Sequence, residues 1–120
     1  MYITSRYKYN MNELIIQATP FLEKIFQLLE KDGIDVSEYE LDHICYRVEI
    51  NERYNQLKNK FSQLGNLINE EEIGGRPIST FRLNQPIEFA ERKINCLELP
   101  SPKMNSFYSE GYEHIEFIII

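Results

Sequence analysis

The most restrictive feature of the sequence is a strict alternation of side-chain character in two segments, 41–50 and 112–119. Successive side chains of a β-strand point to opposite faces, so a period of two predicts a strand in each segment. In the first segment, one face holds Ile44, Tyr46, Val48 and Ile50 and the other holds Leu41, His43, Cys45, Arg47 and Glu49. In the second segment, one face holds Ile115, Phe117 and Ile119 and the other holds His114, Glu116 and Ile118. Both histidines of the chain therefore lie away from the main apolar stripe.

Helices are predicted on both sides of the first strand. A first helix capped by Asn12 gives way to a second that begins at Thr19–Pro20 and stops at Gly33. Residues 51–64 return to a helical period, with Asn51 as the capping residue.

Three further strands are predicted at 66–73, 77–84 and a stretch that ends in 93–100, and Gly74-Gly75 supplies the first turn between them. The order strand, helix, three strands and one more strand is typical of an α+β fold with a mostly antiparallel sheet. We expect a single domain with N-terminal helices in 1–40, a strand–helix–three-strand unit in 41–100, and a loop and strand in 101–120.

Composition argues against several classes of function. The chain has a net charge of −6 and a sequence pI of about 5.0, whereas nucleic-acid binding needs clustered Lys and Arg. No apolar run approaches the roughly 20 residues of a membrane helix, and the N-terminus lacks the apolar stretch of a secretion signal. The two cysteines, Cys45 and Cys96, make no disulfide framework. We therefore expect a cytoplasmic protein that binds neither nucleic acid nor membranes.

Three side chains form a candidate metal site. His43 and His114 each follow an acid and precede an isoleucine where a strand opens. Glu98 stands between two leucines, where a carboxylate needs a base, a donor network or a metal as its partner. Two imidazoles and one carboxylate suit Fe(II), Mn(II), Ni(II) or Zn(II) better than calcium. The alternative is a pair of structural histidines hydrogen-bonded at strand ends, with Glu98 in an ion pair.

Two charged residues share the faces of the histidines. Glu116 lies two residues after the second histidine, and we assign it the catalytic role of moving protons; the alternative is a solvated edge residue. Arg47 lies four residues after the first histidine and is a candidate to hold an anionic substrate through a bidentate contact. The alternative for Arg47 is an ion pair with Glu49 or Glu98.

Four blocks of the sequence resemble a known family. A histidine on the first strand and a glutamate on the fourth resemble one module of the vicinal oxygen chelate (glyoxalase/bleomycin-resistance/dioxygenase) superfamily. The closer resemblance is to the YecM-like family of that superfamily, and it is carried by "DHICYR", "GGRPISTFRL", "CLELPSP" and "GYEHIEF". It implies two modules in a cupped sheet around a divalent metal, with His43 and Glu98 from the first module and His114 from the second. Arg76, in the second block, becomes a candidate substrate contact, with a turn-stabilising role as the alternative.

The family pattern includes a fourth ligand, an acid on the last strand of the second module, which has no counterpart in this sequence. We therefore expect a complete second module to need about 50 more residues, or a second copy of the chain to complete the sheet.

The resemblance implies a metal-dependent enzyme that chelates vicinal oxygens of a small molecule, with isomerase, lyase or dioxygenase chemistry. The alternatives are a non-catalytic module that binds a small molecule or a protein, and an inactive truncated remnant. The apolar final stretch "IEFIII" predicts a homo-oligomer in which the last strand pairs across chains.

Overall fold

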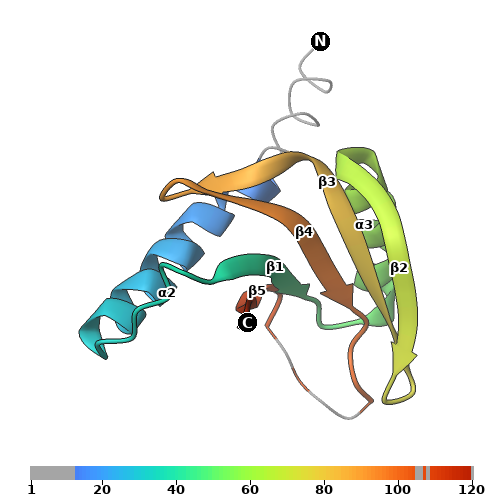
Figure 1. Ribbon diagram of the computed structural model, residues 1–120. Helices are drawn as coiled ribbons and strands as arrows, with labels where there is room; N and C mark the ends of the chain where they lie inside the picture. The colour runs from blue at the N-terminus through green and yellow to red at the C-terminus, as the bar shows by residue number, and fades with distance from the viewer. Residues whose placement is uncertain (1–12, 105–106, 108, 120) are drawn as a thin grey trace. The chain divides into compact units, whose positions relative to one another are not determined.

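A computed structural model describes residues 13–104, 107 and 109–119 (Figure 1). The chain divides into two compact units, Met1–Tyr39 and Glu40–Ile120. The described part of the first unit is dominated by helix α2 (Ala18–Lys31), and the second unit contains helix α3 (Asn51–Leu64) and a sheet of five strands. The predicted α+β class is confirmed.

Helix α2 begins at Ala18, two residues before Pro20, so the predicted capping role of Thr19 is wrong: the cap position is Gln17, with no side-chain hydrogen bond. Pro20 still lies in the first turn, where its missing N–H breaks no intrahelical hydrogen bond. The predicted stop is confirmed, because Gly33 adopts a φ of 70° and closes a Schellman motif just beyond the helix. The predicted cap Asn12 lies outside the described residues. Among the helices that the structure describes, none is long and apolar enough to cross a membrane.

The five strands form one mixed sheet in the order β2-β3-β4-β1-β5. Strand β1 lies between β4, to which it is parallel, and β5, to which it is antiparallel. The β2–β3 and β3–β4 pairs are also antiparallel, which leaves β2 and β5 at the two edges. The strand bounds are β1 (Glu40–Arg47), β2 (Gly65–Ile73), β3 (Arg76–Phe89), β4 (Arg92–Pro100) and β5 (Gly111–Ile118).

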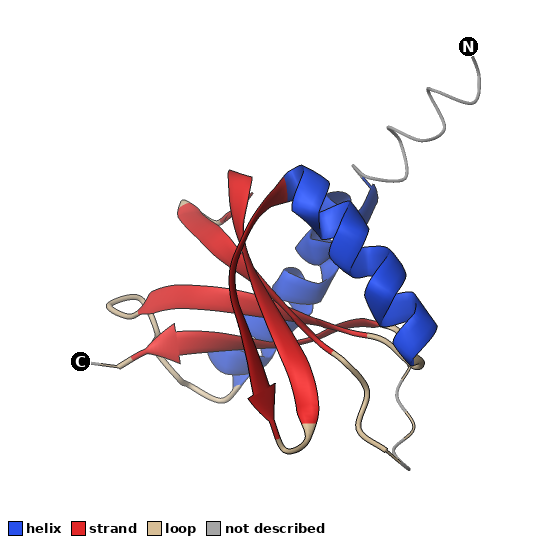
Figure 2. Ribbon diagram, turned by 90° about the vertical axis from the view of Figure 1, so that its right-hand side faces the viewer, coloured by secondary structure: helices blue, strands red, loops and turns tan. Residues whose placement is uncertain are grey.

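Helix α3 packs on one face of this sheet (Figure 2). Its apolar stripe includes Tyr54, Leu57 and Phe61, all buried. The Phe61 ring meets Phe81 of β3 edge-on at 5.8 Å and Tyr46 of β1 at 6.0 Å. The predicted capping role of Asn51 is wrong, because Asn51 is the first helical residue and the cap position is Ile50, with no side-chain hydrogen bond.

The contacts of α3 define the two faces of β1. Tyr46 points to α3, so Ile44 and Val48 share that side and His43 and Cys45 lie on the opposite face. His43 is only 8% exposed, and Cys45 is fully buried. The polar face of β1 is therefore buried at these two residues, which period-two alternation alone did not predict.

Two tight turns join the hairpins. Gly74 and Gly75 connect β2 to β3 with φ angles of 62° and 79°, as the glycine pair predicted. Ala90 and Glu91 connect β3 to β4 with φ angles of 48° and 65°. Neither alanine nor glutamate is typical of a turn that needs positive φ. The strand was therefore predicted to end at residue 84, whereas β3 continues to Phe89. Pro86 lies in a stretch of β3 where the register with β4 shifts, and its missing N–H is tolerated there.

A hydrogen-bonded carboxylate fixes the entry into β5. Glu110 accepts hydrogen bonds from Arg53 Nε and Nη2 at 2.7 and 3.0 Å and from the Tyr46 hydroxyl at 2.9 Å. Partial burial alone would raise the pKa of Glu110, but these hydrogen bonds hold it below its ordinary value. The contacts tie α3, β1 and the segment before β5 together, which positions His114, the fourth residue of β5.

Candidate metal centre

The predicted ligands meet on the sheet face opposite α3. Since residues paired across neighbouring strands share a face, the register sets two rows across β4, β1 and β5. The first row is Cys96, His43 and Glu116, and the second is Glu98, Cys45 and His114. The three residues predicted as metal ligands alternate between these rows and surround one point.

Distances within the cluster are short. His43, Glu98 and His114 each offer one ligand atom, and these atoms all lie within 4.8 Å of one another. Bonds of about 2.1 Å place two ligands of one ion roughly 3–4 Å apart, so small side-chain rotations would let the three share an ion. His43 Nε2 lies 3.2 Å from Glu98 Oε2 and 3.4 Å from Glu116 Oε2. The predicted catalytic Glu116 therefore reaches the cluster, with 65% of its side chain exposed.

The hydrogen bonding of His43 shows what the cluster can accept. Its Nδ1 lies 2.9 Å from Asp42 Oδ2, and an ionised carboxylate can only accept, so Nδ1 carries the hydrogen. In the neutral ring, Nε2 then presents a lone pair toward the oxygens of Glu98 and Glu116. Among the described residues this buried Nε2 has no hydrogen-bond partner. Three atoms that can only accept a hydrogen bond lie close together here, and a cation between them would stabilise this arrangement. One imidazole nitrogen and carboxylate oxygens are ligands that suit a divalent metal ion.

The two cysteines flank the cluster without joining the ligand set. Both are free thiols. Burial raises the pKa of the Cys45 thiol to about 12, and the neighbouring Glu98 adds to the rise. Burial also raises the pKa of Cys96. Because thiols bind metal as thiolates, the histidines and Glu98 are the better donors at neutral pH.

Both predicted substrate contacts carry buried guanidinium atoms. Arg47 forms an ion pair with Glu113, a partner that the sequence analysis did not name. Arg76 donates from Nη1 to the Ser101 carbonyl at 2.7 Å, which ties the start of β3 to the segment after β4. Its buried Nε has no hydrogen-bond partner within the described residues.

The positive charges of Arg47 and Arg76 both act on Cys45, which lies next to Glu98 in the sheet. They lower the pKa of Cys45, although burial and Glu98 raise it by more. Arg76 also lines a cavity of about 700 Å³ between the β2–β3 turn, the start of α3 and the segment after β4. Ile50, Met104 and Lys103 contribute to the same cavity. Basic side chains and apolar surface thus meet in this cavity, and none of the three predicted metal ligands lines it.

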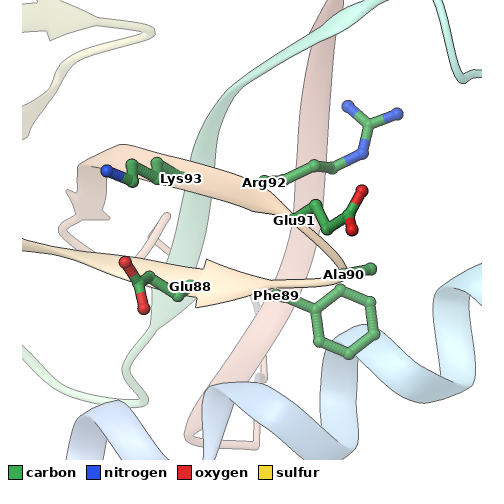
Figure 3. Close-up of a pocket in the computed structure, with 6 residues that line it drawn as sticks. All are labelled: Glu88, Phe89, Ala90, Glu91, Arg92 and Lys93. Carbon is green, nitrogen blue, oxygen red and sulfur yellow. The ribbon is translucent and has the colours of Figure 1, made fainter.

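A second hollow, of about 290 Å³, lies at the tip of the β3–β4 hairpin (Figure 3). In the close-up, Glu88 and Lys93 lie on the two strands away from the turn, and Glu91 and Arg92 lie nearer its tip. Glu98 lies farther along β4, about 20 Å from the start of the strand. This hollow is therefore separate from the metal cluster.

Two contacting residues had no assigned role in the sequence. Asp42 touches His43, and Glu113 touches both His114 and Arg47. The sequence feature that could have identified them is the acid directly before each histidine. Regular strand alternation, however, places neighbouring side chains on opposite faces. A contact between neighbours was therefore not expected.

Comparisons with known proteins connect this architecture to one family. The family model described as "YecM protein" matches residues 10–120. "Protein YecM" of Escherichia coli (strain K12) is 32% identical over 99 residues, which cover 82% of this chain and 53% of that protein. An uncharacterised protein of Haemophilus influenzae (strain ATCC 51907 / DSM 11121 / KW20 / Rd) is 31% identical over 110 residues, which cover 92% of this chain and 58% of the relative.

A solved structure named "Structural Genomics, Protein EC4020" has a TM-score of 0.74 and 28% identity to this chain. The similarity covers 93% of this chain and 57% of that one. The chain thus spans a little over half the length of the relatives that it matches.

Proposed function

Because the chain belongs to the YecM family, we propose that it binds a divalent metal ion through His43, Glu98 and His114 and acts on a small oxygenated anion. The observation that carries this proposal is the buried His43 Nε2, which has no hydrogen-bond partner among the described residues and lies 3.2 and 3.4 Å from two carboxylate oxygens. A protonated His43 would also satisfy these contacts, so the metal itself must be measured. Fe(II), Mn(II), Ni(II) and Zn(II) all suit the donor set.

The pairing of β1 with β5 supports a vicinal oxygen chelate type of architecture. His43 pairs with Glu116 and His114 pairs with Cys45, symmetrically about the Ile44–Ile115 pair. Each strand thus repeats the acid-His-Ile order in the opposite direction. This local two-fold relation is what two equivalent modules would create if β5 opened the second one.

The chain's own residues suggest how a ligand would be handled. A bound divalent ion would supply Lewis acidity toward two adjacent oxygens of a small molecule. Arg47 and Arg76 would hold the anionic part of the ligand beside the cluster. Glu116, exposed and close to His43, would take up or return a proton. Isomerase, lyase and dioxygenase chemistry would each fit this combination of groups.

We expect chelator-treated protein to bind close to one equivalent of at least one of these four metal ions. His43→Ala and His114→Ala should each weaken binding at least about 100-fold, because two remaining donors hold an ion poorly. Isothermal titration calorimetry and elemental analysis give the affinity and stoichiometry. Far-UV circular dichroism checks that each variant is folded.

Glu88→Gln, on the β3–β4 hairpin, is the control for loss of an acid on the same chain. It should bind metal like the wild type. Wild-type protein that takes up none of the four ions, or a His43→Ala variant that binds as tightly as wild type, would show that the cluster is a structural ion-pair network.

The exposed edge of β5 leads to the proposal of a homo-oligomer. Ile118 is 40% exposed and Ile119 is 75% exposed, at and just beyond the end of this edge strand. We expect the double variant Ile118→Lys and Ile119→Lys to dissociate a dimer or larger oligomer, because edge-to-edge pairing tolerates buried lysines poorly. Sedimentation velocity over a range of concentrations measures this change.

Ile68→Lys at the opposite edge is the matched control, since Ile68 is 55% exposed on β2. It should leave the oligomer intact. A wild-type chain that sediments as a monomer at every concentration would refute pairing through β5.

A further inference from the structure

The β1–β5 pairing contains two register shifts, and each one falls at the acid before a histidine. Leu41 pairs with Phe117 and His43 with Glu116, so Asp42 is an extra residue in β1. Around Glu113, the pairing passes from Cys45–His114 to Tyr46–Tyr112, so Glu113 is an extra residue in β5. Both acids therefore occupy β-bulges.

A bulge changes which side chains can meet. In a regular strand, the residue before a histidine points to the opposite face. An extra residue re-aims the local side chains, so that an acid and the following histidine can lie on the same side. Asp42 Oδ2 accordingly lies 2.9 Å from His43 Nδ1, and Glu113 Oε1 lies 3.5 Å from His114 Nδ1.

An acid–histidine contact thus occurs at symmetric places in the two strands, as a hydrogen bond at His43 and as a longer ion-pair distance at His114. In both cases the acid reaches Nδ1, the ring nitrogen next to the backbone. Nδ1–H bonded to a carboxylate leaves Nε2 as the lone-pair atom. For His43, this Nε2 is the atom that faces Glu98.

We propose that Asp42 and Glu113 are positioning residues for the metal ligands: each bulge holds an acid against Nδ1 of the next histidine and sets its tautomer and ring orientation. This inference rests on the proposed metal site. Partners of this kind change metal affinity about 10–100-fold when they are removed. Glu113 also pairs with Arg47, so it joins a ligand of the metal to a candidate substrate contact.

The test combines a spectrum of metal-free protein with a metal titration. Long-range ¹H–¹⁵N correlation spectra of the imidazoles report which nitrogen carries the hydrogen, with no metal present. We expect the wild type to show the Nδ1–H form at His43. Asp42→Ala should lose this preference and bind Zn(II) about 10–100-fold more weakly.

Two further variants sharpen the test. Asp42→Asn keeps a carbonyl oxygen that can accept from Nδ1–H, so it should retain the tautomer and lose less affinity than Asp42→Ala. Glu40→Ala removes an exposed acid from the same strand and should change neither measurement. In the second bulge, Glu113→Ala should produce the corresponding change in the His114 signals.

The outcomes separate this inference from the proposed function. Wild-type protein that binds no Zn(II) or other tested ion would end the metal proposal, and the metal-free spectra would still show whether Asp42 sets the tautomer. Wild-type protein that binds metal, together with an Asp42→Ala variant that keeps the Nδ1–H signal and the wild-type affinity, would overturn the positioning role alone.

Discussion

Gly65→Ala is expected to destabilise the sheet by about 3 kcal/mol or more, because it forces backbone atoms apart. A Cβ atom at this position would overlap the carbonyl oxygen of Arg82 and lie 2.9 Å from the Leu83 Cα. The Gly65 φ of −171° is ordinary extended backbone, so the cost arises from lack of space. Urea denaturation followed by circular dichroism measures the loss of unfolding free energy.

Gly75→Ala is the matched control in the same sheet. Its Cβ would meet no atom within 4 Å, and its φ of 79° adds only a conformational cost of roughly 1–2 kcal/mol. If the two variants lost equal stability, the close approach of β2 and β3 would not be rigid, and the register of that edge would be adjustable.

Glu98→Gln is expected to reduce metal affinity at least about 100-fold while leaving the metal-free protein as stable as before or more stable. The carboxylate is needed as a charged ligand, but without metal its Oε2 lies 3.2 Å from His43 Nε2, a buried nitrogen with no hydrogen-bond partner among the described residues. A glutamine amide could instead donate to this nitrogen, which would satisfy a buried acceptor. Calorimetric titration and thermal melting with and without chelator measure both effects.

Glu88→Gln again serves as the control, since it removes the same charge from the hairpin. The opposite result for Glu98→Gln, a clear loss of stability with unchanged metal affinity, would identify Glu98 as the structural partner of a protonated His43. A Glu98→Gln variant that loses metal affinity but keeps or gains stability would therefore indicate that Glu98 is a metal ligand.

Local chemistry accounts for the parts of the fold that could be predicted. Gly74-Gly75 fits a two-residue hairpin because glycine accepts positive φ, and Gly33 ends α2 for the same reason. The Ala90–Glu91 turn has a similar geometry without a glycine. Tertiary pairing of β3 with β4 over residues on both sides of that turn outweighs its local conformational preference.

By itself, the sequence determined the strand–helix–strand order and the presence of His43, Glu98 and His114 in strands, because hydrophobic period and residue type are local properties. Only the tertiary structure decided that β1 lies between β4 and β5, since strand pairing depends on contacts between distant segments. It also decided the two bulges, which place Asp42 and Glu113 against the histidines that follow them. A single extra residue in a ladder reverses which face a side chain occupies, and period-two alternation does not reveal where that reversal occurs.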